Sequence, residues 1–139
     1  MTKKTNNPIV RLTHDFALEI IDYTAHLDGI RQYIIARQLQ KSGTSIGANV
    51  SEAQNAESRA DFIHKLKIAA KEASETLYWI SLCNESEHLP TNPALFEKAK
   101  DIAQMIGAII TKSRNWNRPP LNSSTFDAEV YGPDSDPTA

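Results

Sequence analysis

Apolar residues recur every three to four positions in four stretches of the chain, which is the spacing of amphipathic helices. The first stretch is expected to begin at Thr13, whose hydroxyl could cap it, and to stop at Asp28-Gly29. The second spans about residues 31–55, the third follows Ser58, and the fourth follows Asn92-Pro93. Ser and Asn commonly cap helix N-termini, and Pro suits the first helical position. The pattern therefore predicts four helices.

The later stretches alternate spacings of four and three, a period of about 3.5 residues that favours helices crossing at roughly 20° in a left-handed bundle. In the second stretch the stripe consists of Ile35, Leu39, Ser42, Ile46, Asn49 and Ala53. Short links make sequential helices antiparallel neighbours. The expected fold is all-α, an up-and-down antiparallel four-helix bundle over residues 13–116. A flexible lead-in (1–12) is expected before the bundle and a flexible acidic tail (117–139) after it.

The apolar stripes are broader than a single four-helix core requires. Such surface on a small protein is usually covered by another subunit, so the bundle is expected to be oligomeric. The chain has 139 residues, which fits one domain with a real core. Its single cysteine, Cys83, fits a reducing compartment. Neither a secretory signal nor an apolar run of about 18 residues is present, so a cytoplasmic protein without a membrane span is expected.

The second helix carries an unusual group of small and polar residues. Each interior glycine costs about 0.5–1 kcal/mol relative to alanine, so Gly43 and Gly47 are expected to permit close approach of another helix. A locally bent helix is the alternative. Asn49 is expected to fix helix register, with purely local bonding as its alternative. The Ser45 hydroxyl is expected to hydrogen-bond to the preceding helical turn. Glu52 is expected to pair with a basic residue on a neighbouring helix or subunit, or else to be solvated.

Basic residues give a candidate nucleic-acid surface, formed by Arg37 and Lys41 on the second helix and by His64, Lys67 and Lys71 on the third. The alternative is a solvated face of mixed charge, because Glu72 and Glu75 are close in sequence. A second basic cluster contains Lys112, Arg114, Trp116 and Arg118. The helix dipole alone favours cations there. All 15 basic residues lie at or before Arg118, whereas four of the 17 acidic residues follow it.

No catalytic, cofactor or metal site is expected. The pairs Asp61-x-x-His64 and Glu85-x-x-His88 resemble half of a di-iron motif, but they sit near opposite ends of one helix. They are too far apart to share a metal. The protein is therefore expected not to be an enzyme. A metal-dependent enzyme in the bundle core and a purely protein-binding module using the acidic tail are the alternatives.

Several segments together resemble the four helix bundle protein family, whose members are encoded in intervening sequences of bacterial large-subunit ribosomal RNA genes and at other bacterial loci. The segments are RQL (37–39), SGTSIGANVSEA (42–53), SRADF (58–62) and KEASETLYW (71–79). The resemblance covers about residues 10–116. The family often has Gly where this chain has Gln54, and the acidic tail is not part of the common pattern.

The resemblance implies an up-and-down bundle assembled as a ring, typically a homopentamer. A relative, the accessory variability determinant of diversity-generating retroelements, is a pentamer that associates with a reverse transcriptase and RNA. The expected function is accordingly that of a homo-oligomeric scaffold or adaptor, with RNA or a nucleic-acid-associated protein as partner. The acidic tail weakens the transfer of nucleic-acid binding from the relative to this chain.

Overall fold

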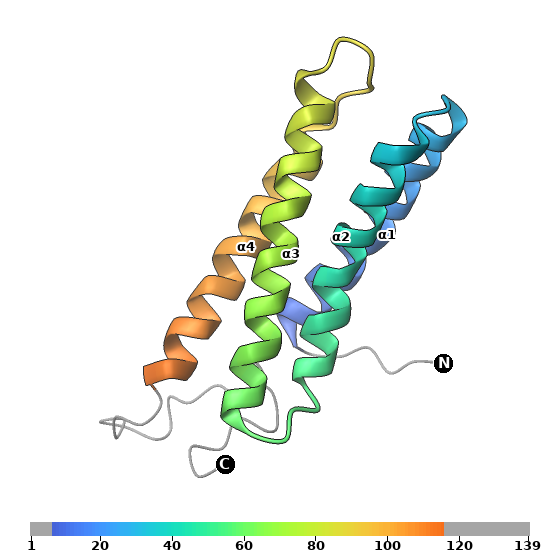
Figure 1. The fold of residues 1–139 in the computed structure, drawn as a ribbon. Coiled ribbons are helices and arrows are strands. Elements are labelled where there is room, and N and C mark those ends of the chain that lie inside the picture. The colour runs from blue at the N-terminus through green and yellow to red at the C-terminus, as the bar shows by residue number, and fades with distance from the viewer. Residues whose placement is uncertain (1–6, 116–139) are drawn as a thin grey trace.

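Four antiparallel helices make up the part of the chain that the computed structural model describes, residues 7–115 (Figure 1). They are α1 (Pro8–Gly29), α2 (Tyr33–Ala53), α3 (Arg59–Glu85) and α4 (Pro93–Arg114). Each helix packs against the next along the chain, and α4 closes the bundle against α1. This part of the chain contains no strand. The prediction of an all-α, up-and-down four-helix bundle is confirmed, while residues 1–6 and the predicted tail lie outside the described residues.

The first helix begins five residues earlier than the sequence analysis expected. Its N-cap is Asn7, whose side-chain oxygen accepts a hydrogen bond from the Ile9 amide (3.3 Å), with Pro8 as the first helical residue. Thr13 is fully buried, and its hydroxyl donates to the Ile9 carbonyl (2.8 Å) instead of capping the helix. The predicted helix start at Thr13 is therefore wrong, because the Asn-Pro pair at 7–8 supplies a better cap.

The starts of α3 and α4 agree with the sequence analysis. The Ser58 hydroxyl accepts from the Asp61 amide (3.0 Å), and the Asp61 carboxylate accepts from the Glu57 amide (3.2 Å). The Asn92 side chain accepts from the Leu95 amide (3.1 Å). Helix α2 begins at Tyr33, two residues later than expected, because Arg31 adopts a left-handed conformation with φ 66°.

The core lies along the bundle axis and receives large apolar side chains from every helix. Its largest members, all under 2% exposed, are Ile9, Phe16, Ile20, Leu27, Leu39, Ile46, Val50, Phe62, Leu66, Ile80, Leu95 and Ile106. The stripe predicted for α2 is partly wrong, since Ile35 and Asn49 are only half-buried while Ala36, Gly43 and Val50 are buried. Helix α2 packs against both α1 and α3, so its buried face is centred between those two contacts.

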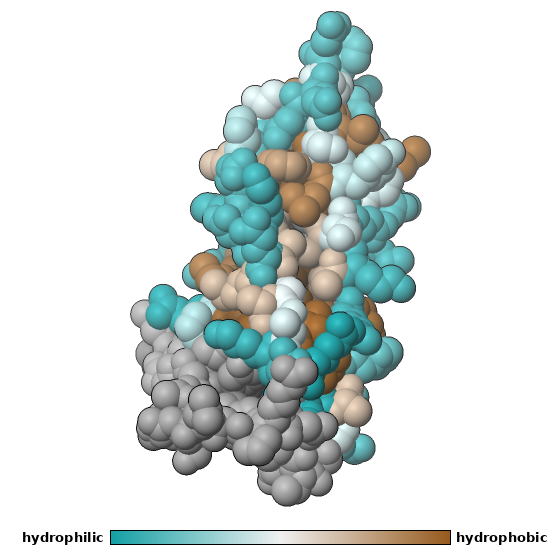
Figure 2. Space-filling view, turned by 90° about the vertical axis from the view of Figure 1, so that its left-hand side faces the viewer, coloured by the Kyte–Doolittle hydropathy of each residue, from teal (hydrophilic) through white to brown (hydrophobic). Residues whose placement is uncertain are grey.

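Apolar side chains also reach the outer surface. Figure 2 looks onto the side of the bundle where α4 lies, and an apolar band runs between hydrophilic flanks there. Along residues 7–115, none of the helices combines the length and apolar character that a membrane span requires.

Candidate functional site

The two glycines of α2 lie where α2 approaches α1. A β-carbon built at Gly43 would lie 2.8 Å from Cγ1 and 2.9 Å from Cγ2 of Ile20. One built at Gly47 would lie 3.1 Å from the backbone oxygen of Thr13. Both glycines are buried. The predicted close approach of another helix is confirmed, and the approaching helix is α1 of the same chain.

A buried pair of hydroxyls joins α2 to α3 near the middle of the bundle. The Thr76 and Ser42 hydroxyls are hydrogen-bonded at 3.0 Å, and the Thr76 hydroxyl also bonds the Glu72 carbonyl (2.7 Å). Both side chains are fully buried. Ser42 was expected on the apolar stripe of its helix, but its pairing with Thr76 becomes visible only when the register between the two helices is known.

Ser45 and Asn49 bond within α2. The Ser45 hydroxyl donates to the Lys41 carbonyl (2.6 Å), which confirms the bond expected to the preceding turn. The Asn49 amide donates to the Ser45 carbonyl (2.8 Å) from a half-buried position. This is the local bonding kept as the alternative for Asn49, and its role in fixing register stays a prediction.

Glu52 forms an ion pair with Lys65 of α3, its neighbouring helix, at 2.9 Å. This contact agrees with the expected pairing to a basic residue, and the hydrogen bond to Glu52 raises the pKa of Lys65. The Glu52 side chain is 60% exposed, so the pair lies in solvent and is screened by salt.

The five basic residues predicted for nucleic-acid contact are all exposed. Arg37 and Lys41 occupy the first half of α2, whereas His64, Lys67 and Lys71 occupy the first half of α3. Because α2 and α3 are antiparallel, Arg37 and His64 lie toward opposite ends of the bundle (Figure 1).

Acidic residues interrupt the space between the two basic groups. Burial and the neighbouring Glu75 raise the pKa of Glu72, while Lys41 and Lys71 act in the opposite direction. Glu72 therefore lies within the electrostatic reach of Lys41 on α2 and of Lys71 on its own helix. The middle of the α2–α3 surface is the face of mixed charge that was the alternative reading, so the five residues do not form one continuous basic stripe.

Charge is instead divided between the two ends of the bundle. The termini end is defined here as the half in which α1 begins, α2 ends, α3 begins and α4 ends, each helix being cut at its midpoint. Its basic residues are Arg11, Arg59, Lys65, Lys67, Lys71, Lys112 and Arg114. Its acidic residues are Asp15, Glu52, Glu57 and Asp61. Among the described residues, seven basic and four acidic ones thus lie at this end.

The other half, called the double-loop end, contains the α1–α2 turn and the α3–α4 loop. Its basic residues are Arg31, Arg37, Lys41, Lys98 and Lys100. Its acidic residues are Glu19, Asp22, Asp28, Glu72, Glu75, Glu85, Glu87, Glu97 and Asp101. Counted over residues 7–115, the double-loop end is therefore acidic by four charges, whereas the termini end is basic by three.

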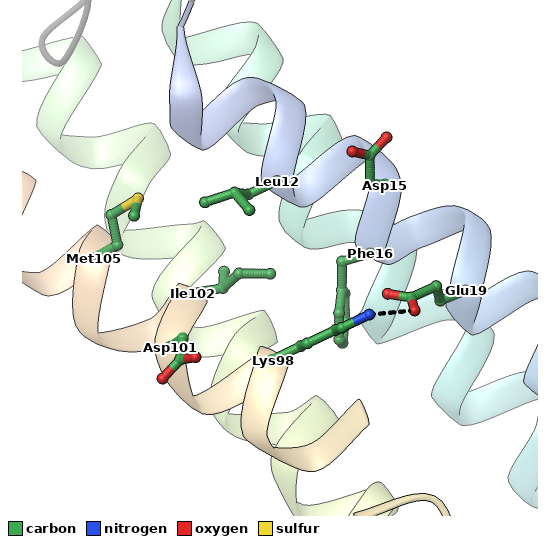
Figure 3. Close-up of a pocket in the computed structure, with 8 residues that line it drawn as sticks. All are labelled: Leu12, Asp15, Phe16, Glu19, Lys98, Asp101, Ile102 and Met105. Carbon is green, nitrogen blue, oxygen red and sulfur yellow. Dashed lines mark hydrogen bonds and ion pairs between the residues drawn. The ribbon is translucent and has the colours of Figure 1, made fainter. Parts of the chain in front are cut away.

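A shallow groove of about 240 Å³ runs between α1 and α4 (Figure 3). Leu12, Phe16, Ile102 and Met105 provide its apolar lining. Its polar rim consists of Asp15, Glu19, Lys98 and Asp101, with an ion pair between Lys98 and Glu19 at 2.5 Å. The charged groups lie at the edge and do not converge on a point in the groove, so the groove suits an apolar side chain better than a polar substrate.

The one buried thiol of the described residues lies beside a buried tyrosine. Burial and the neighbouring Cys83 thiol raise the pKa of Tyr23, whose hydroxyl donates to the Pro90 carbonyl. Burial also raises the pKa of Cys83, which keeps the thiol neutral and poorly nucleophilic. Within residues 7–115, no three His, Cys, Asp or Glu side chains are grouped so that they could hold a metal ion.

Residues 5–112 match the family described as 23S rRNA-intervening sequence protein. The chain belongs to this family. Its fold is similar to the crystal structure of a protein with unknown function from the S23 ribosomal protein family of Bacteroides thetaiotaomicron, with a TM-score of 0.70 and 36% sequence identity. That similarity covers 73% of this chain and 97% of the relative. A comparison with curated proteins gives no match.

Membership of the 23S rRNA-intervening sequence protein family agrees with the resemblance found in the sequence. The descriptions of the family and of the solved relative name no reaction and no ligand. The surface features that bear on function are therefore the exposed apolar residues and the unequal charge of the two ends of the bundle.

Proposed function

We propose that this protein assembles with copies of itself into a cytoplasmic scaffold or adaptor, without catalytic activity, for RNA or an RNA-associated protein. The observation that supports assembly is the exposure of large apolar side chains outside a core that is already complete. Among the described residues these are Leu12, Leu18, Ile21, Ile30, Tyr33, Ile34, Tyr78 and Leu82. Ile34 is 81% exposed and Tyr78 is 56% exposed.

These side chains are not needed to close the subunit. Phe16 and Phe62 fill the interior at 1% exposure each, so the core does not depend on residues outside it. Leu18 and Ile21 lie three positions apart on α1 and share one outer face of that helix. Burying a fully exposed side chain of this kind contributes about 1.5–3 kcal/mol, and Leu18 and Ile21, which are 51% and 42% exposed, would each contribute about half of that. A second copy of the chain that covers this face would therefore gain stability from it.

The family resemblance supplies the ring number that we propose, a homopentamer. Light scattering on the full chain at micromolar concentration tests it, because a subunit has a mass of 15.5 kDa. We expect a mass several times larger, and a monomer would overturn the assembly half of the proposal.

A pair of variants tests the residues. Leu18→Asp with Ile21→Asp places two charges on the outer face of α1 and should release monomers. The matched control, Gln32→Asp with Asn55→Asp, adds the same charge at exposed positions in the links between helices. The control should keep the mass of the natural protein. Equal loss of assembly in both variants would show that charge alone breaks the contact, and would remove the role given to the α1 face.

A further inference from the structure

The unequal charge of the two ends is not a product of helix dipoles. Two helices begin and two end at each end of the bundle, so their dipole contributions largely cancel. Lys65, Lys67 and Lys71 lie more than one turn from the start of α3, beyond the first turn in which its dipole acts. Only Lys112 and Arg114, in the last turn of α4, are placed as the dipole would place them. The basic excess of the termini end therefore needs another reason.

The cations of this end are available to a ligand to different degrees. Lys65 is paired with Glu52, so its charge is already compensated. Lys67, Lys112 and Arg114 are exposed, and Lys71 is exposed but interacts electrostatically with Glu72. Lys67 and Lys71 are one helical turn apart, about 6 Å along the axis of α3. A row of cations with such spacing can follow a phosphate backbone, and lysine contacts to phosphate do not select a sequence.

We infer that RNA is bound through its phosphates at the termini end, by Lys67 and Lys71 of α3 together with Lys112 and Arg114 of α4, and is not bound at the double-loop end. The inference rests on the proposed function and names the surface used for its RNA partner. It assigns no such contact to Arg37, which the sequence analysis grouped with the same set.

The acidic end does not cancel this attraction. Helix α3 has 27 residues and is therefore about 40 Å long. Charges in solution are screened over about 8 Å at physiological salt, so an anion at the termini end is shielded from the carboxylates at the far end. Arg11 is exposed at this end as well, so the described part of one subunit offers five exposed cations there, and an assembly that repeats them would multiply the phosphate contacts.

The test is binding of a labelled RNA hairpin to the full chain across a salt series. Lys67→Ala with Lys112→Ala removes two proposed contacts at the termini end. The matched control, Arg37→Ala with Lys100→Ala, removes two exposed cations from the double-loop end. We expect the first variant to lower the slope of log affinity against log salt by about 1.4–1.8 per bound subunit, since each phosphate contact contributes about 0.7–0.9. The control should keep the slope and affinity of the natural protein.

Far-UV circular dichroism and light scattering on both variants establish that fold and assembly are retained. Equal losses in the two variants would overturn the inference while leaving RNA binding itself intact. Equal binding by all three proteins would overturn it as well. Absence of RNA binding by the natural protein at low salt would overturn both the inference and the RNA half of the proposed function. The assembly half would then still be judged by the measured mass alone.

Discussion

Replacing Gly43 with alanine should destabilise the subunit, although alanine is the better helix former. The new β-carbon would lie 2.8 Å from Cγ1 and 2.9 Å from Cγ2 of Ile20. Those atoms are attached directly to the Ile20 β-carbon, and the side chain is fully buried, so it cannot simply swing away. Overpacking of this kind costs about 1–3 kcal/mol, and the gain in helix propensity returns only about 0.5–1 kcal/mol. The free energy of unfolding should fall by about 1–2 kcal/mol.

Gly107→Ala is the matched control, because a β-carbon at Gly107 meets no atom within 4 Å. It should raise stability by about 0.5–1 kcal/mol through helix propensity alone. Urea unfolding followed by circular dichroism, at one protein concentration, measures both variants. The difference between them isolates the overpacking cost, since both contain the same propensity gain. In an Ile20→Ala background the contact is absent, and Gly43→Ala should then stabilise like Gly107→Ala. Equal stability of the two single variants would refute the close-approach argument.

Two further predictions concern buried polar groups. Thr76→Val removes the hydroxyl partner of Ser42 and should lower the free energy of unfolding, measured in urea, by about 1–3 kcal/mol, because the buried Ser42 hydroxyl loses its hydrogen bond between helices. Adding Ser42→Ala should recover part of the loss. A full loss retained in the double variant would contradict the explanation by an unpaired Ser42 hydroxyl. Burial raises the pKa of Tyr23, so the unfolded chain ionises near pH 10 while the folded chain keeps a neutral phenol. The stability that Tyr23 contributes should therefore be fully present below pH 10 and be lost as the pH rises above it. Tyr23→Phe should flatten that fall in the free energy of unfolding, and an unchanged pH profile in this variant would contradict the assignment.

Local signals in the sequence were sufficient for most helix boundaries. The Asn-Pro pair at 92–93 correctly marks the start of α4, and the same pair at 7–8 marks the start of α1. The first start was misplaced because Thr13 is also a good capping residue by type. Nothing in a short window shows that Thr13 lies under Gly47, since that contact joins positions 34 residues apart.

Contacts that depend on the packing of helices could not be predicted in the same way. The glycines suggested a close approach but not its partner, which is fixed by Ile20 and Thr13 on α1. The hydroxyl pair of Ser42 and Thr76 requires the register of α2 against α3. The charge of each bundle end likewise appears only when antiparallel packing brings the first half of α3 to the second half of α4.

The segment by which the family is recognised is used largely inside the subunit. Gly43 and Gly47 are buried against α1, so neither can reach a neighbouring copy. Glu52 lies on the surface but is already paired with Lys65 of the same chain. An assembly must therefore rely on other residues, such as Leu18 and Ile21, which are exposed on α1. The two sets are separable by experiment: Gly43→Ala should lower the stability of the subunit, whereas charges at Leu18 and Ile21 should change its mass in solution while far-UV circular dichroism stays unchanged. A protein in which both changes acted alike would have one interface serving fold and assembly together, which the burial of the glycines argues against.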